Sequence, residues 1–328
     1  LLHDALAGLD PPLFLSISSQ VLPQHREYER TSTVAVNAYV GPLMASYLQR
    51  LEKALGSGNV ARSRKGRGRI TGPPKVRVMQ SSGGSISARA AADQPVRTIL
   101  SGPAGGVVGA YAVASEAGYP DIITLDMGGT TAKASMIEAG KISYSPQYEV
   151  GAGLSAGSRL MGGQGELVGA PSIDIAEVGA GGGSIASVDS GGLVHVGPQS
   201  AGSSPGPACY GLGGDKPTVT DANVVLGYIS PDYFMGGTME ISVDLAAKAV
   251  KRHIADPLKI SVEEAAGLIY ATVNQNMVLG LSEVSIQRGI DPRGFLVVAG
   301  GGCSSAHIVP IARELGIKDI LIPKIAPV

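Results

Sequence analysis

The chain has 328 residues, 44% of them hydrophobic, with 26 basic and 27 acidic residues. This length buries one large core or two moderate ones, and the near balance of charge gives no indication of nucleic acid or a membrane surface as partner. The longest apolar runs fall short of the roughly 20 residues that a membrane span needs. Cys209 and Cys303 lack a CxxC spacing, which favours a reducing cytoplasm without structural zinc. The 47 glycines show no collagen period, a composition that favours tight turns and close backbone approaches.

The amino-terminal part is expected to form an irregular and helical segment over residues 1–60. A helical pattern runs from Val34 to Leu55, and Pro42 is expected to break or restart it. The charged cluster at 25–30 favours a solvated face, so His25 is not taken as an acid or base. Residues 61–74 are predicted to be a basic flexible loop, preferred over a phosphate- or RNA-binding segment because no aromatic residue is interleaved for stacking. The start of the chain has neither a signal segment nor a methionine, so we expect a fragment or a processed chain.

Residues 75–328 are predicted to form one α/β domain, because strand patterns alternate with helical ones. Within it, residues 145–215 form a glycine-rich, β-rich part and residues 245–290 a helical part. The expected elements, in chain order, are a strand at 76–80, a glycine-rich turn and small-residue helix at 101–118, a strand at 121–126, a hairpin turning at 139–140, a helix from 262 to about 287, and a closing strand, glycine turn, helix and strand from 294.

The stretch TLDMGGTTAKAS, from Thr124 to Ser135, combines an acidic residue at a strand end with a glycine turn. A hairpin of this kind cradles phosphate, because glycines let backbone N–H groups approach phosphate oxygens without a Cβ in between. A carboxylate beside the phosphates suits Mg²⁺, which takes few carboxylates and keeps much of its water. Taken alone, the motif is explained equally well by a plain hairpin with a capping aspartate. Asp126 is expected to bind Mg²⁺ and is assigned as metal ligand and catalytic residue. The residues expected to contact phosphate are Gly128, Gly129, Thr130, Thr131 and Lys133.

A second glycine turn, at 297–307, follows an apolar strand and precedes a helix. Its glycines suit the floor of an adenosine pocket, and the following helix N-terminus favours negative charge. The G-x-G-x-x-G pattern is not met, since Ser305 stands where the last glycine should fall, and the Walker lysine motif is absent. The residues assigned to this pocket are Gly300, Gly301 and Gly302.

These two turns, in this order, are typical of the actin-like ATPase superfamily, and further motifs resemble the hydantoinase A/oxoprolinase family from about Arg26 onward. The resemblance implies an actin-like (ribonuclease H-like) fold with a central mixed sheet, flanking helices and a glycine-rich β-rich insertion. It also implies ATP-dependent phosphorylation of a carbonyl or carboxyl oxygen, with Gly102 and Gly105 against the nucleotide. The motifs are RTSTVAVNAYVGPLMASYL, SGPAGGVVGA, LDMGGTTAKASMI, PSIDIAEVGAGGGSIASVD, VGPQSAGSSPGPACYGLGGDKPTVTDANVVLGYI and RGIDPRGFLVVAGGG.

The function expected from this resemblance is ATP-dependent ring opening of a cyclic amide by a cytoplasmic hetero-oligomer with a hydantoinase B-type partner. One alternative is the β-type subunit of a ketone carboxylase, and another is a non-catalytic actin-like nucleotide switch. Two departures limit the transfer of residue roles. Nothing before Asp126 matches the family's first phosphate hairpin, and Gly300–Ser305 reads GGGCSS where relatives usually read Gly-Gly-Ala-Gly-Pro.

Several other polar residues could serve a site or the fold. Asp174 lies in a strand pattern and is expected to face a cleft, whereas Asp221 is assigned equally to a site and to a helix cap. His307 is expected to be packed or solvent-facing rather than a ligand. Neither cysteine has a base at a recognisable spacing, so neither is taken as a nucleophile. His195 and His3 show no metal-ligand spacing.

Overall fold

The structure is a computed structural model that describes residues 6, 13–57, 75–150, 165–324 and 326. The chain forms two compact units that are discontinuous in sequence. Unit 1 contains the described residues up to Gly105 together with 144–150 and 165–173, and unit 2 contains the remainder. This division differs from the predicted one, because residues 75–105 belong with the amino-terminal segment. The predicted basic loop at 61–74 lies outside the described residues.

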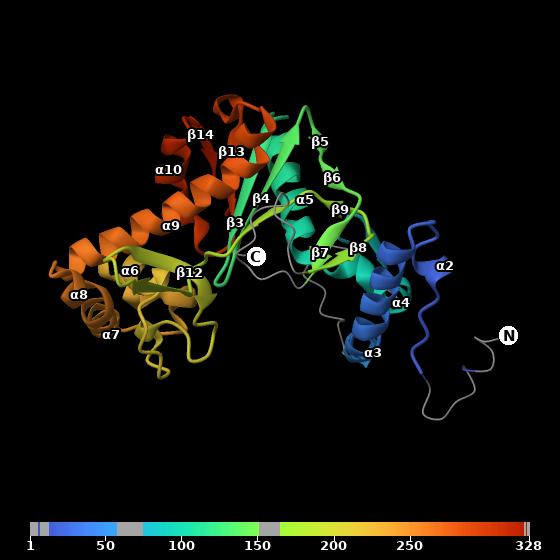
Figure 1. The fold of residues 1–328 in the computed structure, drawn as a ribbon, viewed down its shortest axis with the longest axis horizontal. Helices are drawn as coiled ribbons and strands as arrows, with labels where there is room; N and C mark the ends of the chain where they lie inside the picture. The colour runs from blue at the N-terminus through green and yellow to red at the C-terminus, as the bar shows by residue number, and fades with distance from the viewer. Residues whose placement is uncertain (1–5, 7–12, 58–74, 151–164, 325, 327–328) are drawn as a thin grey trace, which may run out of the picture. The chain divides into compact units, whose positions relative to one another are not determined.

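Unit 1 is built around the helix α3 (Glu27–Ser57), which is longer than predicted. The helix continues through Pro42, so the predicted break there is wrong: a proline costs a helix one hydrogen bond but does not end it where packing holds both halves. The other described elements that lie wholly in unit 1 are short (Figure 1). They are α2 (Ser18–Val21), α4 (Ala88–Asp93), a 3₁₀ turn (Pro95–Thr98) and the strand pairs β1 (Arg77–Met79) with β2 (Ser85–Ser87), β6 (Tyr144–Ser145) with β9 (Ser172–Ile173), and β7 (Tyr148–Val150) with β8 (Glu166–Val168).

Unit 2 contains a six-stranded mixed sheet with the order β10-β4-β3-β13-β14, to which β5 adds beside β4. The β3–β4 and β4–β10 pairs are antiparallel, and β13 runs parallel to both β3 and β14. The predicted central mixed sheet is therefore confirmed. The strands are β3 (Ile122–Met127), β4 (Ala132–Glu138), β5 (Lys141–Ile142), β10 (Ala176–Val178), β13 (Leu296–Gly300) and β14 (Asp319–Leu321).

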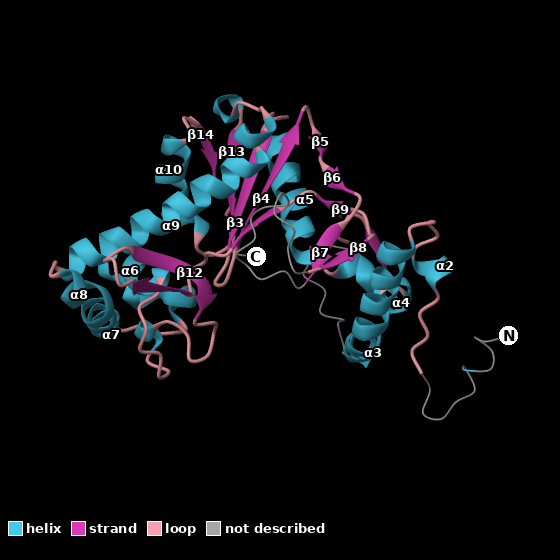
Figure 2. Cartoon of the chain, viewed as in Figure 1, coloured by secondary structure: helices cyan, strands magenta, loops and turns pink. Residues whose placement is uncertain are grey.

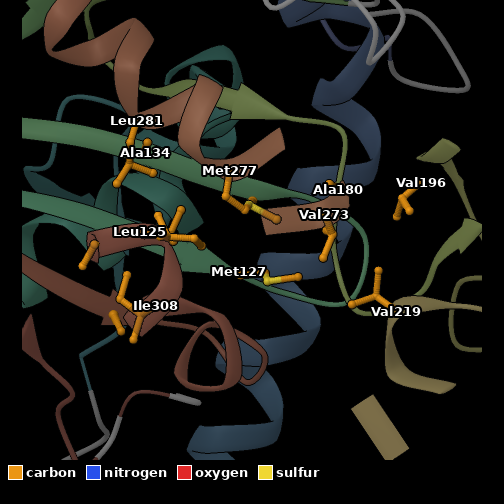
Figure 3. Close-up of a cluster of buried hydrophobic side chains, with 14 of the residues drawn as sticks. Leu125, Met127, Ala134, Ala180, Val196, Val219, Val273, Met277, Leu281 and Ile308 are labelled. Carbon is orange, nitrogen blue, oxygen red and sulfur yellow. The ribbon is translucent and has the colours of Figure 1, made fainter. Parts of the chain in front are cut away.

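One face of this sheet packs against α9 (Val262–Val284) and α10 (Ser304–Glu314). Alternate residues of β3, β4 and β13 enter the main hydrophobic core because successive side chains of a strand point to opposite faces. Figure 3 shows Leu125, Met127 and Ala134 of the sheet beside Met277 and Leu281 of α9. The intervening residues, Asp126 among them, therefore point to the opposite face.

Several predicted elements are confirmed in this unit. The helix predicted from Val262 to about Gln287 is α9, which ends at Val284, and the closing strand, glycine turn, helix and strand are β13, α10 and β14. The hairpin turns at Ala139 and Gly140, both with positive φ. The glycine-rich turn predicted at the start of 101–118 is wrong, because these residues form the first turns of α5, which spans Ser101–Glu116.

Unit 2 also contains the antiparallel pair β11 (Ser184–Val188) and β12 (Val194–Ser200) and several helices beside it (Figure 2). A short buried helix, α6 (Val219–Val225), packs against α7 (Val243–Val250) and α9. A π-helical turn (Lys251–Ala255) and α8 (Asp256–Leu258) connect α7 to α9. Among the residues that the structure describes, no helix is long and apolar enough to cross a membrane.

Candidate nucleotide-binding site

The candidate site lies where β3 and β4 meet at the tip of a hairpin. Asp126 pairs with Lys133 of β4 on one side and with Gly300 of β13 on the other. Lys133 in turn pairs with Glu177 of β10. Residues directly opposite one another in a sheet share a face, so these four positions form a row on the face turned away from α9 and α10. Because Asp126 pairs with Gly300, the glycine turn after β3 and the glycine turn after β13 lie at the same end of the sheet.

The Asp126 carboxylate lies in a cradle of glycines. A Cβ at Gly301 would lie 2.4 Å from Asp126 Oδ1, and a Cβ at Gly106 of α5 would lie 3.4 Å from Oδ2. Gly301 also has φ of +79°, a left-handed conformation that other residues rarely adopt. Within the described residues the carboxylate has no hydrogen-bond or ion-pair partner. A partly exposed carboxylate with its oxygens free is available to a ligand rather than used as a cap.

The hairpin tip presents N–H groups because its carbonyl groups are held from behind. Gly182 N–H donates to the Gly128 carbonyl at 3.0 Å, and Gly183 N–H donates to the Gly129 carbonyl at 2.6 Å. In a trans peptide the C=O and the following N–H point in opposite directions. The N–H groups of Gly129 and Thr130 therefore point away from the supporting loop, and neither has an acceptor among the described residues. Successive open backbone N–H groups are a general means of binding an anion.

The supporting loop, Gly181–Gly183, was not assigned to the site from the sequence. A Cβ at Gly181 would lie 2.7 Å from the Thr130 carbonyl carbon and 2.8 Å from the Gly128 oxygen. Any residue larger than glycine would push against the hairpin backbone. The run of glycines was the available signal, but its position beside the tip depends on the β10–β4 pairing, which local sequence does not reveal.

Lys133 lies beside the tip but is engaged within the protein. Its Nζ donates to Thr131 Oγ1 at 2.6 Å and lies 3.3 Å from Glu177 Oε1. The side chain of Glu177 is 43% exposed, and such an ion pair is weak. Lys133 therefore fixes the Thr131 hydroxyl in this structure, and its contact with phosphate stays a prediction.

The remaining predicted glycines differ in their positions. Gly102 and Gly105 lie inside α5, where a Cβ at Gly102 would meet nothing and one at Gly105 would contact Met79. The α5 glycine that faces Asp126 is Gly106. Gly301 N–H donates to the Ala326 carbonyl at 2.7 Å, whereas Gly302 is exposed with open space around it. Their assignment to nucleotide stays a prediction.

Asp221 is a structural cap rather than a site residue. It is fully buried and forms a capping box with Thr218 at the start of α6. Its carboxylate also accepts from the N–H groups of Ala208 and Cys209, at 3.2 and 2.7 Å. The sequence allowed Asp221 to be either a site residue or a helix cap, and the structure shows the cap. Its additional contacts to the loop at Ala208 and Cys209 were not predicted.

His307 is packed in a buried polar network, as expected. Its Nδ1 lies 2.7 Å from Asn274 Oδ1 and its Nε2 lies 2.9 Å from Asn223 Nδ2, an arrangement that suits a neutral ring protonated at Nδ1. Tyr270 stacks on the ring with centroids 4.9 Å apart. Burial lowers the pKa of His307 to about 4, so the ring is uncharged at neutral pH.

The other polar residues considered from the sequence make contacts within the protein or are buried. Asp174 is buried and pairs with Arg288, and His195 pairs with Asp189 at 2.8 Å on the surface. Burial raises the pKa of the thiols of Cys209 and Cys303, which is the opposite of what a nucleophilic cysteine needs. His3 lies outside the described residues.

The site suits Mg²⁺ bound to phosphate better than a protein-enclosed metal. Within the described ranges no group of three His, Cys, Asp or Glu residues is arranged to hold a metal ion. Mg²⁺ is commonly held by one or two carboxylates plus phosphate oxygens and water. The single unpartnered carboxylate of Asp126, in the strand that leads into the tip with its open N–H groups, fits that pattern.

Unit 2 is an α/β domain with a mixed sheet and helices packed on it, and the fold class is that of the actin-like ATPases. The sequence profile of the hydantoinase/oxoprolinase family matches residues 30–328. The chain belongs to this family, and the predicted resemblance is confirmed.

The chain is also similar in sequence and in fold to known ATP-dependent enzymes. The chain is 39% identical over 316 residues to the caprolactamase subunit alpha of Pseudomonas jessenii, covering 96% of the chain and 42% of that relative. The crystal structure of the ATP-dependent caprolactamase from Pseudomonas jessenii superposes with a TM-score of 0.73 at 40% identity, over 95% of this chain and 41% of that one. A nucleotide-free acetone carboxylase structure superposes with a TM-score of 0.76 at 29% identity, over 94% and 40%. The chain thus spans about two fifths of the length of these relatives.

Proposed function

We propose that the protein containing this chain opens a cyclic amide in an ATP-dependent reaction, and that this chain binds the ATP phosphates at the β3–β4 tip. The observations that carry the proposal are the unpartnered Asp126 carboxylate at the end of the strand that leads into the tip and the open N–H groups of Gly129 and Thr130 at the tip itself. Membership of a family with an ATP-dependent caprolactamase supports the substrate class.

In this reaction the amide oxygen attacks the γ-phosphorus and ADP leaves. Water adds to the activated carbon, the ring C–N bond breaks with the nitrogen leaving as an amine, and a second water hydrolyses the acyl phosphate. Bound Mg²⁺ supplies neutralisation of phosphate charge. The chain's own residues would orient the ATP phosphates and stabilise their charge. Asp126 would hold the metal or its water shell, and the tip N–H groups would hold phosphate oxygens in place.

The test is phosphate release by the full-length protein with its partner subunit, measured with Mg-ATP and a panel of caprolactam, hydantoin and 5-oxoproline. We expect one ATP hydrolysed per ring opened, and strong loss of that activity in Asp126→Asn. No stimulation by any cyclic amide would contradict the proposal.

A second candidate is ATP-dependent carboxylation of a ketone, favoured by the similarity to acetone carboxylase. The same tip would then activate ketone and bicarbonate by phosphorylation. Phosphate release that requires both acetone or acetophenone and bicarbonate, with no response to lactams, would select this reaction. Nucleotide binding without turnover under either condition would instead indicate a nucleotide switch.

A further inference from the structure

A buried threonine stands directly behind the loop that supports the hairpin tip. Thr220, in the first turn of α6, is 4% exposed. Both its N–H and its hydroxyl donate to the Gly182 carbonyl, at 2.7 and 2.8 Å. Two donors on one carbonyl fix the orientation of the peptide unit that joins Gly182 to Gly183.

The Gly182–Gly183 peptide unit is hydrogen-bonded in turn to a second peptide unit, the one that joins Gly129 to Thr130 at the tip. The N–H of the same unit, that of Gly183, donates to the Gly129 carbonyl. The Gly129 carbonyl and the Thr130 N–H belong to one planar trans peptide and point in opposite directions. Two peptide units in series thus connect the Thr220 hydroxyl to the open Thr130 N–H, and hydrogen bonds in such a series polarise one another.

We propose that Thr220 is a positioning residue for phosphate binding, which acts through Gly182 and Gly183 on the N–H groups of the tip. The inference rests on the proposed nucleotide site. It assigns α6 a role beyond packing: Asp221 anchors the loop at 208–209, while Thr220 sets the geometry of the anion-binding backbone. A Cβ would be crowded at both glycines of this connection: at Gly182 it would lie 2.6 Å from Cys303 Sγ, and at Gly183 it would lie 2.9 Å from Ser200 Oγ and 3.0 Å from the Gly129 carbonyl oxygen.

The experiment compares Thr220→Val, Thr220→Ser and a matched control, Thr238→Val, in the full-length protein. Valine keeps the shape and the backbone N–H bond but removes the hydroxyl donor, whereas serine keeps the donor. Thr238 is an exposed threonine whose hydroxyl also donates to a backbone carbonyl, that of Met235, at 2.8 Å. Two quantities are measured: amide hydrogen exchange of Gly183 without nucleotide, and the Kd for Mg-ATP by calorimetry.

Thr220→Val is expected to accelerate Gly183 exchange and to raise the Kd about five-fold, the effect of one lost hydrogen bond. Thr220→Ser and Thr238→Val are expected to resemble the parent. Unchanged exchange and an unchanged Kd in Thr220→Val would overturn the inference, as would equal losses in valine and serine variants. Failure of the parent itself to bind ATP would instead refute the nucleotide site, and the exchange comparison would still decide whether Thr220 holds the tip.

Discussion

Gly181→Ala is the substitution for which the structure gives the most direct expectation. The new methyl group would lie 2.7–2.8 Å from three backbone atoms of the hairpin, where ordinary contact begins at 3.4 Å. The tip must therefore retreat by about 0.7 Å. Overpacking of this kind costs roughly 1–3 kcal/mol of unfolding free energy, or a fall of about 2–12 °C in Tm for a unit of this size.

The same displacement should damage the anion site. A shift of about 0.7 Å moves the tip N–H groups out of the 2.7–3.2 Å range of good hydrogen bonds, so the Kd for Mg-ATP should rise at least ten-fold. Thermal melting and calorimetric titration of the same preparation measure both effects. Gly129→Ala is the matched control for stability, because a Cβ there meets no atom within 4 Å. It should melt like the parent yet bind ATP weakly, since the methyl group stands beside the phosphate-facing N–H.

Two results would refute this reasoning. If Gly181→Ala melted and bound ATP like the parent, the close approach of the loop to the hairpin would be wrong. If Gly129→Ala bound ATP normally, the N–H groups of the tip would not be the phosphate site.

The remaining predictions concern charge and titration. Asp126→Asn should lower substrate-dependent phosphate release on the order of 100- to 1000-fold with little change in Tm, because the carboxylate has no partner among the described residues; turnover within a few-fold of the parent would rule out the metal assignment. Burial lowers the pKa of His307 from 6.5 to about 4, so its contribution to stability is complete above pH 6.5 and is lost as pH falls toward 4. Urea unfolding at pH 7.5 and 5.5 should differ by about 1 kcal/mol from this group, and the difference should shrink in His307→Gln. The Cys209 thiol is buried and burial raises its pKa, so it should resist iodoacetamide at pH 8 until urea is added; rapid labelling of Cys209 in the folded protein would contradict this burial.

The sequence alone determined the elements whose cause is local. The hairpin from β3 to β4 follows from an apolar run before a glycine turn and a strand pattern after it, and α9 follows from its long helical pattern. The position of Asp126 at a strand end was likewise readable, because strand and turn signals lie next to each other in the chain. Pro42 does not end α3, since a local helix breaker is tolerated where packing supports both sides.

The tertiary structure alone decided which of these local features meet. Gly181–Gly183 and Thr220 are far from Gly128 in sequence, and strand order and helix packing bring them behind the tip. Lys133, adjacent to the motif, faces Glu177 because of the β10–β4 register. Single-sequence patterns report a residue's own periodicity and turn preference, whereas the direction of a free N–H depends on what holds the carbonyl on the other side of its peptide plane.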